Sequence, residues 1–290
     1  MPPAARPLAS PVALVTGASS GIGDAITQRL LEGRWTVYAA ARRVARMRAL
    51  EHAGARLLAL DVSDDDSMCA AVSRITAEEG RLDALVNNAG YGAYGALEDV
   101  PMEEGRRQFD VNVFGPARLT QLVLPTMRTQ ARGRWARARI VNVSSIGGKI
   151  HEPMGCWYHA TKFALEGLSD CLRMELAPFD IDVVVIEPGA IKTEWAGLAR
   201  DALLSTSGAT AYAAQARATA GLLAGADDRS AAPPALVADA VWRALTDKRP
   251  KTRYAVGGGA ALLLFLRRVL SDRSFDRVMR AATSRMAGAR

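Results

Sequence analysis

The sequence predicts an α/β protein built as a single domain around a doubly wound parallel sheet, with a C-terminal helical extension. Short apolar segments alternate with longer segments of helical periodicity along most of the chain. A glycine-rich segment lies between the first predicted strand and the first predicted helix, as in many doubly wound folds. The 290 residues, 49% of them apolar and 23% charged, have a globular composition and suffice to bury one large core.

Seven segments are predicted as strands. Most are nearly continuous apolar runs separated by helices, a pattern typical of parallel strands that are covered on both faces. They are residues 12–16, 36–41, 56–61, 82–87, 139–144, 182–187 and 252–256.

The segments between these strands are predicted as helices because their apolar residues recur every three to four positions. Pro178 is expected to end the helix predicted over residues 155–176, since proline cannot continue a helix. The predicted helices are residues 21–31, 44–52, 67–79, 103–128, 155–176 and 234–246.

Two further segments are less regular. Residues 196–234 are rich in Ala, Gly and Thr and have weak helical periodicity. Over residues 194–234 we expect a mobile flap that covers the substrate, with an ordinary surface excursion as the alternative. Residues 259–290 mix apolar and arginine positions, as an amphipathic helical tail would.

The first candidate site is the segment Thr16-Gly-Ala-Ser-Ser-Gly-Ile-Gly23. Glycines at this place let the backbone turn tightly and approach a diphosphate at the N-terminus of the following helix. Three glycines at this spacing are more than a structural turn needs. The segment therefore predicts a Rossmann-like dinucleotide site.

The end of the second strand indicates which dinucleotide is preferred. Sites that prefer NAD have an acidic residue there, but this sequence has Ala41 followed by Arg42 and Arg43. A guanidinium can bind a 2′-phosphate, although either arginine could simply point into solvent. The pattern favours NADP(H).

Two other strands end in polar residues. Asp61-Val62 ends the third strand and Asn87-Asn-Ala-Gly90 ends the fourth, at the sheet edge where ligands of parallel sheets bind. Asp61 is a candidate to accept a hydrogen bond from an adenine amino group. It could equally cap the next helix, for which Ser63 and Asp64 are also candidates.

The segment Tyr158-His-Ala-Thr-Lys162 lies in a predicted helix, so its first and last side chains share one face. An ammonium group beside a phenol lowers the phenol's pKa from its ordinary value of about 10, which suits the phenol to proton transfer. The spacing alone is common by chance on a solvated helix. Together with the preceding motifs it predicts an active site.

In order and spacing, these motifs resemble the short-chain dehydrogenase/reductase family. The resemblance covers residues 12–193, and residues 91–101 and 109–115 are similar to hydroxysteroid and retinoid dehydrogenase branches, which implies a bulky apolar alcohol or ketone. Trp157, Trp195 and Leu198 are candidates for the pocket lining, or else core residues. The matching motifs are residues 16–23, 87–90, Asn112, Ser144-Ser145, residues 158–162 and Pro188-Gly189.

The resemblance implies a role for each catalytic candidate. Tyr158 would give a proton to the carbonyl oxygen as hydride reaches the carbon, and Lys162 would hold the nicotinamide ribose and lower the pKa of the tyrosine. Ser145, rather than Ser144, would hydrogen-bond the substrate oxygen. Asn112 would anchor a water in a proton relay, and otherwise it is only a polar break in a helix.

The resemblance also implies a set of cofactor-binding residues, which includes Tyr158 and Lys162. The others are Gly17, Ser19, Gly21, Ile22 and Gly23 at the diphosphate, Arg42 and Arg43 at the 2′-phosphate, Asp61 and Val62 at the adenine, Asn87 or Asn88, Ala89 and Gly90 at the ribose, and Pro188, Gly189, Ile191 and Thr193 at the carboxamide.

The charge of the chain permits other partners but does not favour them. A net charge of +7 and a pI near 9.7 suit nucleic acid or an anionic membrane, yet most arginines are single and spread, as on a solvated surface. Residues 128–139 are interpreted as a surface insertion that does not bind nucleic acid. For the arginines of residues 267–290 the favoured reading is packing on the domain or on another subunit, followed by closure of the substrate pocket and then by contact with anionic lipid.

Cysteine and leader patterns bear on the compartment. Cys69, Cys156 and Cys171 are scattered, so neither a disulfide framework nor a metal site is predicted. No signal peptide or membrane span is recognised, so we expect a soluble cytoplasmic protein. His151, His159 and Cys156 are interpreted as bystanders.

The sequence therefore predicts an NADP(H)-dependent carbonyl reductase that interconverts a ketone or aldehyde and its alcohol. The resemblance implies a homodimer or homotetramer. One alternative is a catalytically silent, NADP(H)-sensing protein of the same fold, which the presence of all four catalytic candidates disfavours. Another is a basic module that binds nucleic acid or membranes.

Overall fold

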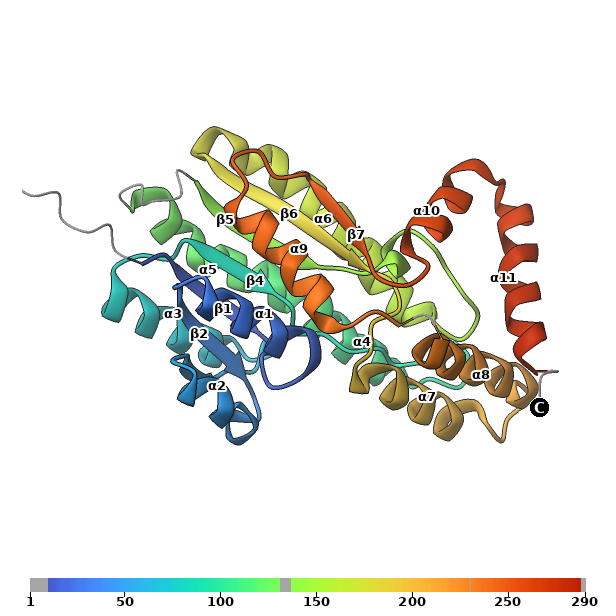
Figure 1. Ribbon diagram of the computed structural model, residues 1–290. Coiled ribbons are helices and arrows are strands. Elements are labelled where there is room, and N and C mark those ends of the chain that lie inside the picture. The colour runs from blue at the N-terminus through green and yellow to red at the C-terminus, as the bar shows by residue number, and fades with distance from the viewer. Residues whose placement is uncertain (1–9, 131–136, 230, 288–290) are drawn as a thin grey trace, which may run out of the picture.

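The computed structural model describes residues 10–130, 137–229 and 231–287 and has a seven-stranded parallel sheet at its centre (Figure 1). The strand order is β3-β2-β1-β4-β5-β6-β7, so the chain winds outwards from β1 and then from β4. The predicted doubly wound α/β fold is confirmed. The strands are β1 (Val12–Thr16), β2 (Thr36–Ala41), β3 (Arg56–Ala59), β4 (Ala84–Asn87), β5 (Ala138–Val143), β6 (Ile181–Pro188) and β7 (Arg253–Val256).

Helices cover both faces of the sheet, and alternate residues of β1 serve the two layers. Ala13 and Val15 pack into one core cluster, whereas Val12 and Leu14 pack into the other. The first cluster is covered by α1 (Gly21–Glu32), α2 (Arg48–His52) and α9 (Pro234–Thr246), and the second by α3 (Asp65–Glu79), α5 (Gly115–Thr129) and the end of α6 (Cys156–Leu176).

The helix predicted over residues 103–128 contains an irregular turn. Helix α4 (Met102–Phe109) passes through the π-helical turn Asp110–Phe114 into α5. Within this turn the Asn112 side chain points inwards and bonds both main-chain groups of Tyr91. Such turns commonly occur at functional sites, and periodicity alone does not reveal them.

Residues 196–234, expected to be only weakly structured, largely form two helices. Helices α7 (Glu194–Ser207) and α8 (Ala213–Arg229) pack together through buried small residues, including Ala199, Ala216 and Ala220. Alanine contributes little contrast between an apolar and a polar face, so the sequence pattern understates these helices.

The C-terminal extension is helical, as predicted, up to the last described residue, Ala287. Helices α10 (Ala260–Val269) and α11 (Asp272–Ala287) lie at one end of the molecule, where α11 packs beside α8 (Figure 1). Phe275 and Met279 of α11 are buried against Ile150, which precedes α6. Residues 288–290 of the predicted tail lie outside the described residues.

The arginine-rich stretch 128–139 is only partly described, because residues 131–136 lie outside the described ranges. Arg137 forms ion pairs with Asp180 and Asp182. Arg139 is buried and donates to the main-chain carbonyl groups of Ala244 and Asp247 at the C-terminal end of α9. The two arginines thus bind within the fold.

The described ranges contain neither a membrane span nor a metal-binding cluster. No helix there is both long and apolar enough to cross a bilayer. The same ranges contain no group of three or more His, Cys, Asp or Glu side chains arranged to hold a metal ion.

Candidate active site

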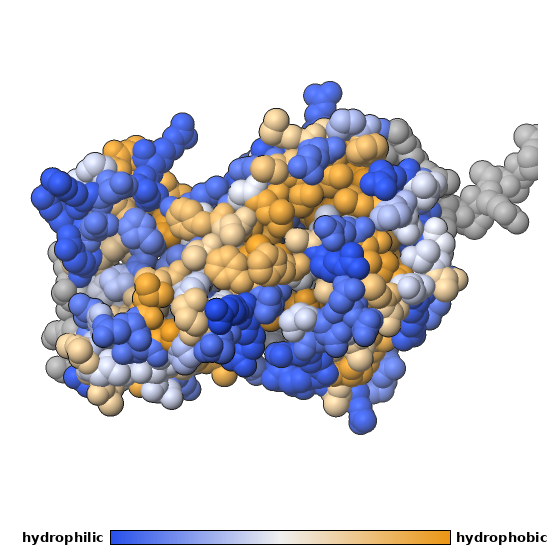
Figure 2. All heavy atoms as spheres, turned by 180° about the vertical axis from the view of Figure 1, so that it is seen from behind, coloured by the Kyte–Doolittle hydropathy of each residue, from blue (hydrophilic) through white to orange (hydrophobic). Residues whose placement is uncertain are grey.

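A large cavity of about 1450 Å³ opens at the carboxyl ends of the strands. The cofactor candidates other than Asn87 line it, and among the catalytic candidates only Asn112 does not. Figure 2, from the side opposite to Figure 1, shows apolar residues gathered across the middle of that face between hydrophilic ones. The lining candidates are Gly17, Ser19, Gly21, Ile22, Gly23, Arg42, Arg43, Asp61, Val62, Asn88, Ala89, Gly90, Ser145, Tyr158, Lys162, Pro188, Gly189, Ile191 and Thr193.

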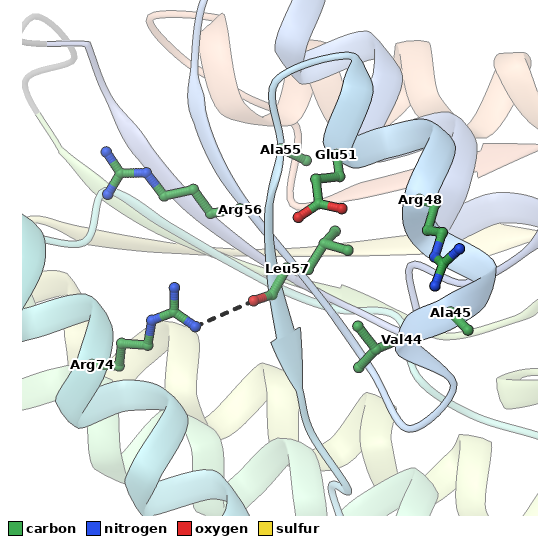
Figure 3. A pocket seen from close by; sticks show the side chains of 8 residues that line it. All are labelled: Val44, Ala45, Arg48, Glu51, Ala55, Arg56, Leu57 and Arg74. Carbon is green, nitrogen blue, oxygen red and sulfur yellow. Dashed lines mark hydrogen bonds between the residues drawn. The ribbon is translucent and has the colours of Figure 1, made fainter.

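A second hollow, of about 630 Å³, lies beside the edge strand β3 (Figure 3). Two of its charged side chains already have partners: Arg74 donates to the carbonyl oxygen of Leu57, and Arg56 pairs with Glu78 and Glu79. None of the predicted site residues lines it. The large cavity is therefore the candidate active site.

The glycine turn has the shape that a diphosphate requires. Gly17 and Gly21 have φ of 68° and 57°, values that side chains other than glycine rarely adopt. A Cβ atom on Gly17 would lie 2.9 Å from the Cα of Ala89, and one on Gly23 would lie 2.3 Å from the Gly17 carbonyl oxygen. The turn thus exposes backbone amides at the N-terminus of α1, where an anion is favoured.

The end of β4 holds this turn in place. The Asn88 side-chain amide donates to the Thr16 carbonyl oxygen, 2.9 Å away, and the Thr16 hydroxyl accepts from the backbone amides of Asn88 and Ala89. Asn87 lies deeper and donates to Asn142 of the neighbouring strand. Of the two asparagines, Asn88 contacts the cavity and Asn87 supports the sheet.

Arg42 and Arg43 follow β2, are exposed, and line the cavity, as does Asp61. Although partial burial opposes it, hydrogen bonds from Ser63 and the charge of Arg42 lower the pKa of Asp61 below its ordinary value. Asp61 does not cap α3, because Asp64 accepts the capping bond from the Ser67 amide. Of the two roles left open for Asp61, the cap is thereby excluded, and the contact with an adenine amino group stays a prediction.

Tyr158 and Lys162 are both buried on α6. Burial lowers the pKa of Lys162 to about 8, opposed by the charge of Glu166. Burial also raises the pKa of Tyr158 to about 12, a hydrogen bond with Ser145 opposes this, and the charge of Glu152 adds to it. Desolvation is the largest effect in this arrangement, and the lowering of the phenol's pKa by Lys162 stays a prediction.

Hydrogen bonds hold Ser145 and Asn112, the remaining catalytic candidates, in place. The Ser145 hydroxyl accepts from the Gly147 amide, 3.0 Å away, and so faces the cavity beside Tyr158. The Asn112 amide donates to the Thr161 hydroxyl, 3.0 Å away, which ties the π-helical turn to α6 next to Lys162. Asn112 is thus more than a polar break in a helix.

Two aromatic rings pack against Tyr158, and no sequence pattern links their residues to it. The ring centroids of Tyr94 and Trp195 lie 5.7 Å and 5.2 Å from that of Tyr158. Trp195 and Leu198 line the cavity, whereas Trp157 packs against Gly105 and the ring of Phe109. Tyr94 lies in the loop after β4, where no periodicity marks it.

The C-terminal helices complete the cavity wall. Leu263 of α10 and Val278, Met279 and Ala282 of α11 line it. The His151 ring contacts Asp276 of α11 at 3.0 Å, so this histidine anchors the tail. The tail therefore packs on the domain, and closure of the substrate pocket and contact with lipid stay predictions.

Comparison with known proteins decides the family. A family profile described as short chain dehydrogenase matches residues 11–203. The chain belongs to the short-chain dehydrogenase/reductase family. It is thus an oxidoreductase that acts on small molecules with a nicotinamide cofactor.

Full-length relatives support this assignment. The chain is 35% identical to a probable short-chain type dehydrogenase/reductase of Helicobacter pylori, over 93% of this chain and 96% of that protein. It is 34% identical to an NADPH-dependent 3-dehydrocapnine reductase of Ornithobacterium rhinotracheale, over 92% and 95% of the two chains. A solved short-chain dehydrogenase from Streptomyces avermitilis matches with a TM-score of 0.76 and 35% identity, over 95% and 96%.

Proposed function

We propose that this short-chain dehydrogenase/reductase reduces a ketone or aldehyde with NADPH, or oxidises the corresponding alcohol with NADP. The observation that carries the proposal is that Ser145, Tyr158 and Lys162 line the same cavity as the glycine turn and Arg42. One dinucleotide bound in this cavity would contact both groups of residues.

The residues at the reacting end can do general acid chemistry. When bound, the reduced nicotinamide supplies the hydride. The Tyr158 hydroxyl, with its pKa raised to about 12, stays protonated at neutral pH and donates its proton to the substrate oxygen. The Ser145 hydroxyl binds the same oxygen and stabilises its developing negative charge. Trp195 and the neighbouring apolar wall exclude water from this end.

Lys162 and Asn112 support the tyrosine. The Lys162 ammonium binds the nicotinamide ribose and places a positive charge near the phenol. Asn112 lies beside Lys162, and we propose that it holds a water from which the tyrosine regains its proton. Gly90 fits this arrangement, because a Cβ there would lie 3.1 Å from the Asn112 side-chain oxygen.

The preference for NADPH rests on Arg42 and Arg43. Both are exposed cations directly after Ala41, which stands where an NAD-preferring site has a carboxylate, and the Ornithobacterium relative is described as NADPH-dependent. Among the described residues, Asp61 is the nearest acidic lining residue along the chain, and it bonds Ser63. We propose the same cofactor for this chain.

We extend the proposal to the surroundings of the site. Residues 194–234, with α7 and α8, act as the cover of an apolar substrate. The enzyme works in the cytoplasm, as its three free cysteines suggest, and as a homodimer or homotetramer.

The test is turnover by the purified protein with NADPH and a panel of aliphatic and aromatic ketones, alongside NADPH binding measured by fluorescence. Consumption of NADPH in proportion to alcohol formed supports the proposal. Tight NADPH binding without turnover of any ketone would instead favour the silent, sensing alternative.

A further inference from the structure

The substrate end of the cavity contains a carboxylate that the proposed chemistry does not use. Glu152, in the loop before α6, lines the cavity and is only 15% exposed. The hydroxyl of Tyr94 donates a hydrogen bond to it, 2.8 Å away, and the Tyr94 ring packs against Tyr158. The carboxylate therefore lies one aromatic side chain from the proposed proton donor.

Each of the other carboxylates that line this cavity forms an ion pair or a hydrogen bond with a nearby side chain. Glu104 pairs with Arg107 and accepts from Tyr91, and Glu194 pairs with Arg46. Asp61, at the adenine end, bonds Ser63. Each of them is thereby neutralised or held by the protein itself.

Glu152 differs from Glu104 and Glu194 because no Lys or Arg side chain among the described residues forms an ion pair with it. Within the described ranges its one ion-pair contact is the His159 ring, whose Nε2 lies 3.9 Å away, beyond hydrogen-bonding distance. The other ring nitrogen of His159 is engaged with the Gly147 carbonyl oxygen at 2.9 Å. A nearly buried carboxylate without a close cation costs free energy, which a cation bound in the cavity recovers.

The wall beyond Trp195 is apolar. Leu222 and Leu223 of α8, Leu263 of α10 and Met279 of α11 line the cavity there. Methionine and leucine side chains adapt to flexible hydrocarbon chains and offer such a ligand no directional bonds.

We infer that the substrate is an amphiphilic amino ketone: its protonated amine, close to the carbonyl carbon, binds Glu152, and its hydrocarbon chain lies along the wall formed by α8, α10 and α11. This inference rests on the proposed function and specifies its substrate class. Glu152 is the residue that determines specificity, and Tyr94 orients its carboxylate.

The experiment compares two probes with NADPH: an α-amino ketone with a dodecyl chain, and the dodecyl ketone without the amine. The wild-type protein should have a kcat/KM at least about tenfold higher for the amino ketone, a ratio expected for one buried ion pair. Glu152→Gln keeps an oxygen that accepts from Tyr94 but removes the charge, so the ratio should fall about tenfold or more. Tyr94→Phe keeps the charge and removes the bond, so most of the preference should remain.

Two outcomes overturn the inference: equal kcat/KM for the two ketones in the wild-type protein, or an equal loss for both in Glu152→Gln. Binding of dodecylamine and of dodecanol to the NADPH complex, measured by thermal shift, provides a readout without turnover. If neither these two ketones nor any ketone of the panel above is reduced, the proposed function fails, and an amine preference that Glu152→Gln abolishes still supports the binding site. Equal binding of amine and alcohol rejects it.

Discussion

The Nζ atom of Lys162 donates a hydrogen bond to the main-chain carbonyl oxygen of Val143, 3.0 Å away. This bond joins α6 to the end of β5. The ammonium group is therefore held at the edge of the sheet. Burial explains why a lysine that is one helical turn from Tyr158 has a lowered pKa itself, because desolvation penalises the ammonium form.

A pH dependence follows from these two groups. The Lys162 pKa, lowered to about 8, means that the ammonium form is present below that pH and is lost above it, whereas Tyr158 keeps its proton up to about 12. We expect kcat/KM for carbonyl reduction to decrease as pH rises through about 8, with the loss of one proton. A pH profile measured with NADPH checks this, and circular dichroism at each pH controls for unfolding. A profile that stays level through this range would mean that Lys162 does not titrate there.

Replacing Tyr158 with phenylalanine separates chemistry from packing. The ring still packs against Tyr94 and Trp195, so the fold should persist, but the proton donor is gone. We expect kcat to fall by about 10²–10⁴-fold, the usual contribution of a positioned acid, with NADPH binding retained. Stopped-flow turnover and fluorescence titration measure the two quantities. Turnover equal to that of the parent would remove Tyr158 from the mechanism.

The arginines after β2 can be tested against a matched surface arginine. Replacing Arg42 and Arg43 together with alanine should raise the KM for NADPH about tenfold or more and leave the KM for NADH nearly unchanged, because only NADPH carries the 2′-phosphate. Arg48→Ala is the control, since Arg48 is exposed and lines the separate hollow of Figure 3. Equal losses for both dinucleotides would show that the arginines act on the fold and not on the phosphate.

The glycine turn allows a similar comparison. Gly17→Ala places a side chain at a backbone position of positive φ and a Cβ atom 2.9 Å from the Cα of Ala89. The turn must therefore move. Gly54 also has a positive φ, of 102°, but a Cβ atom there would have no neighbour within 4 Å. We expect Gly17→Ala to weaken NADPH binding at least about tenfold and Gly54→Ala to cost only about 1 kcal/mol of stability. Isothermal calorimetry and chemical unfolding measure the two effects, and similar NADPH affinities for both variants would contradict the diphosphate role.

Much of the fold was predictable because the strands are local apolar runs. The strand Val12–Thr16 and the glycines after it are visible in a few consecutive residues, and so the sheet and the dinucleotide end of the cavity follow from short windows of sequence. Helices α7 and α8 were underestimated because alanine gives little amphipathic contrast.

Features that depend on distant contacts were not predictable in this way. Asn112 is defined by its bonds to Tyr91 and Thr161, which lie 21 and 49 positions away. The pKa of Tyr158 depends on how deeply the fold buries it, and spacing on a helix does not report burial. Glu152 lies in a loop whose path is set by α6 and the C-terminal helices, so no local pattern marks it.

The C-terminal helices connect stability with substrate binding. Phe275 is fully buried against Ile150, and the next turn of α11 places Met279 in the cavity wall. Phe275→Ala should therefore destabilise the protein by about 3 kcal/mol, the usual cost of deleting a buried ring, and should raise the KM for a long-chain ketone more than for a short one. Phe265→Ala, at a position 60% exposed on α10, is the control and should change neither quantity much. Thermal unfolding and KM measurements with dodecyl and ethyl ketones provide the comparison. If Phe275→Ala raises both KM values equally, α11 stabilises the fold but does not contact the hydrocarbon chain of the ketone.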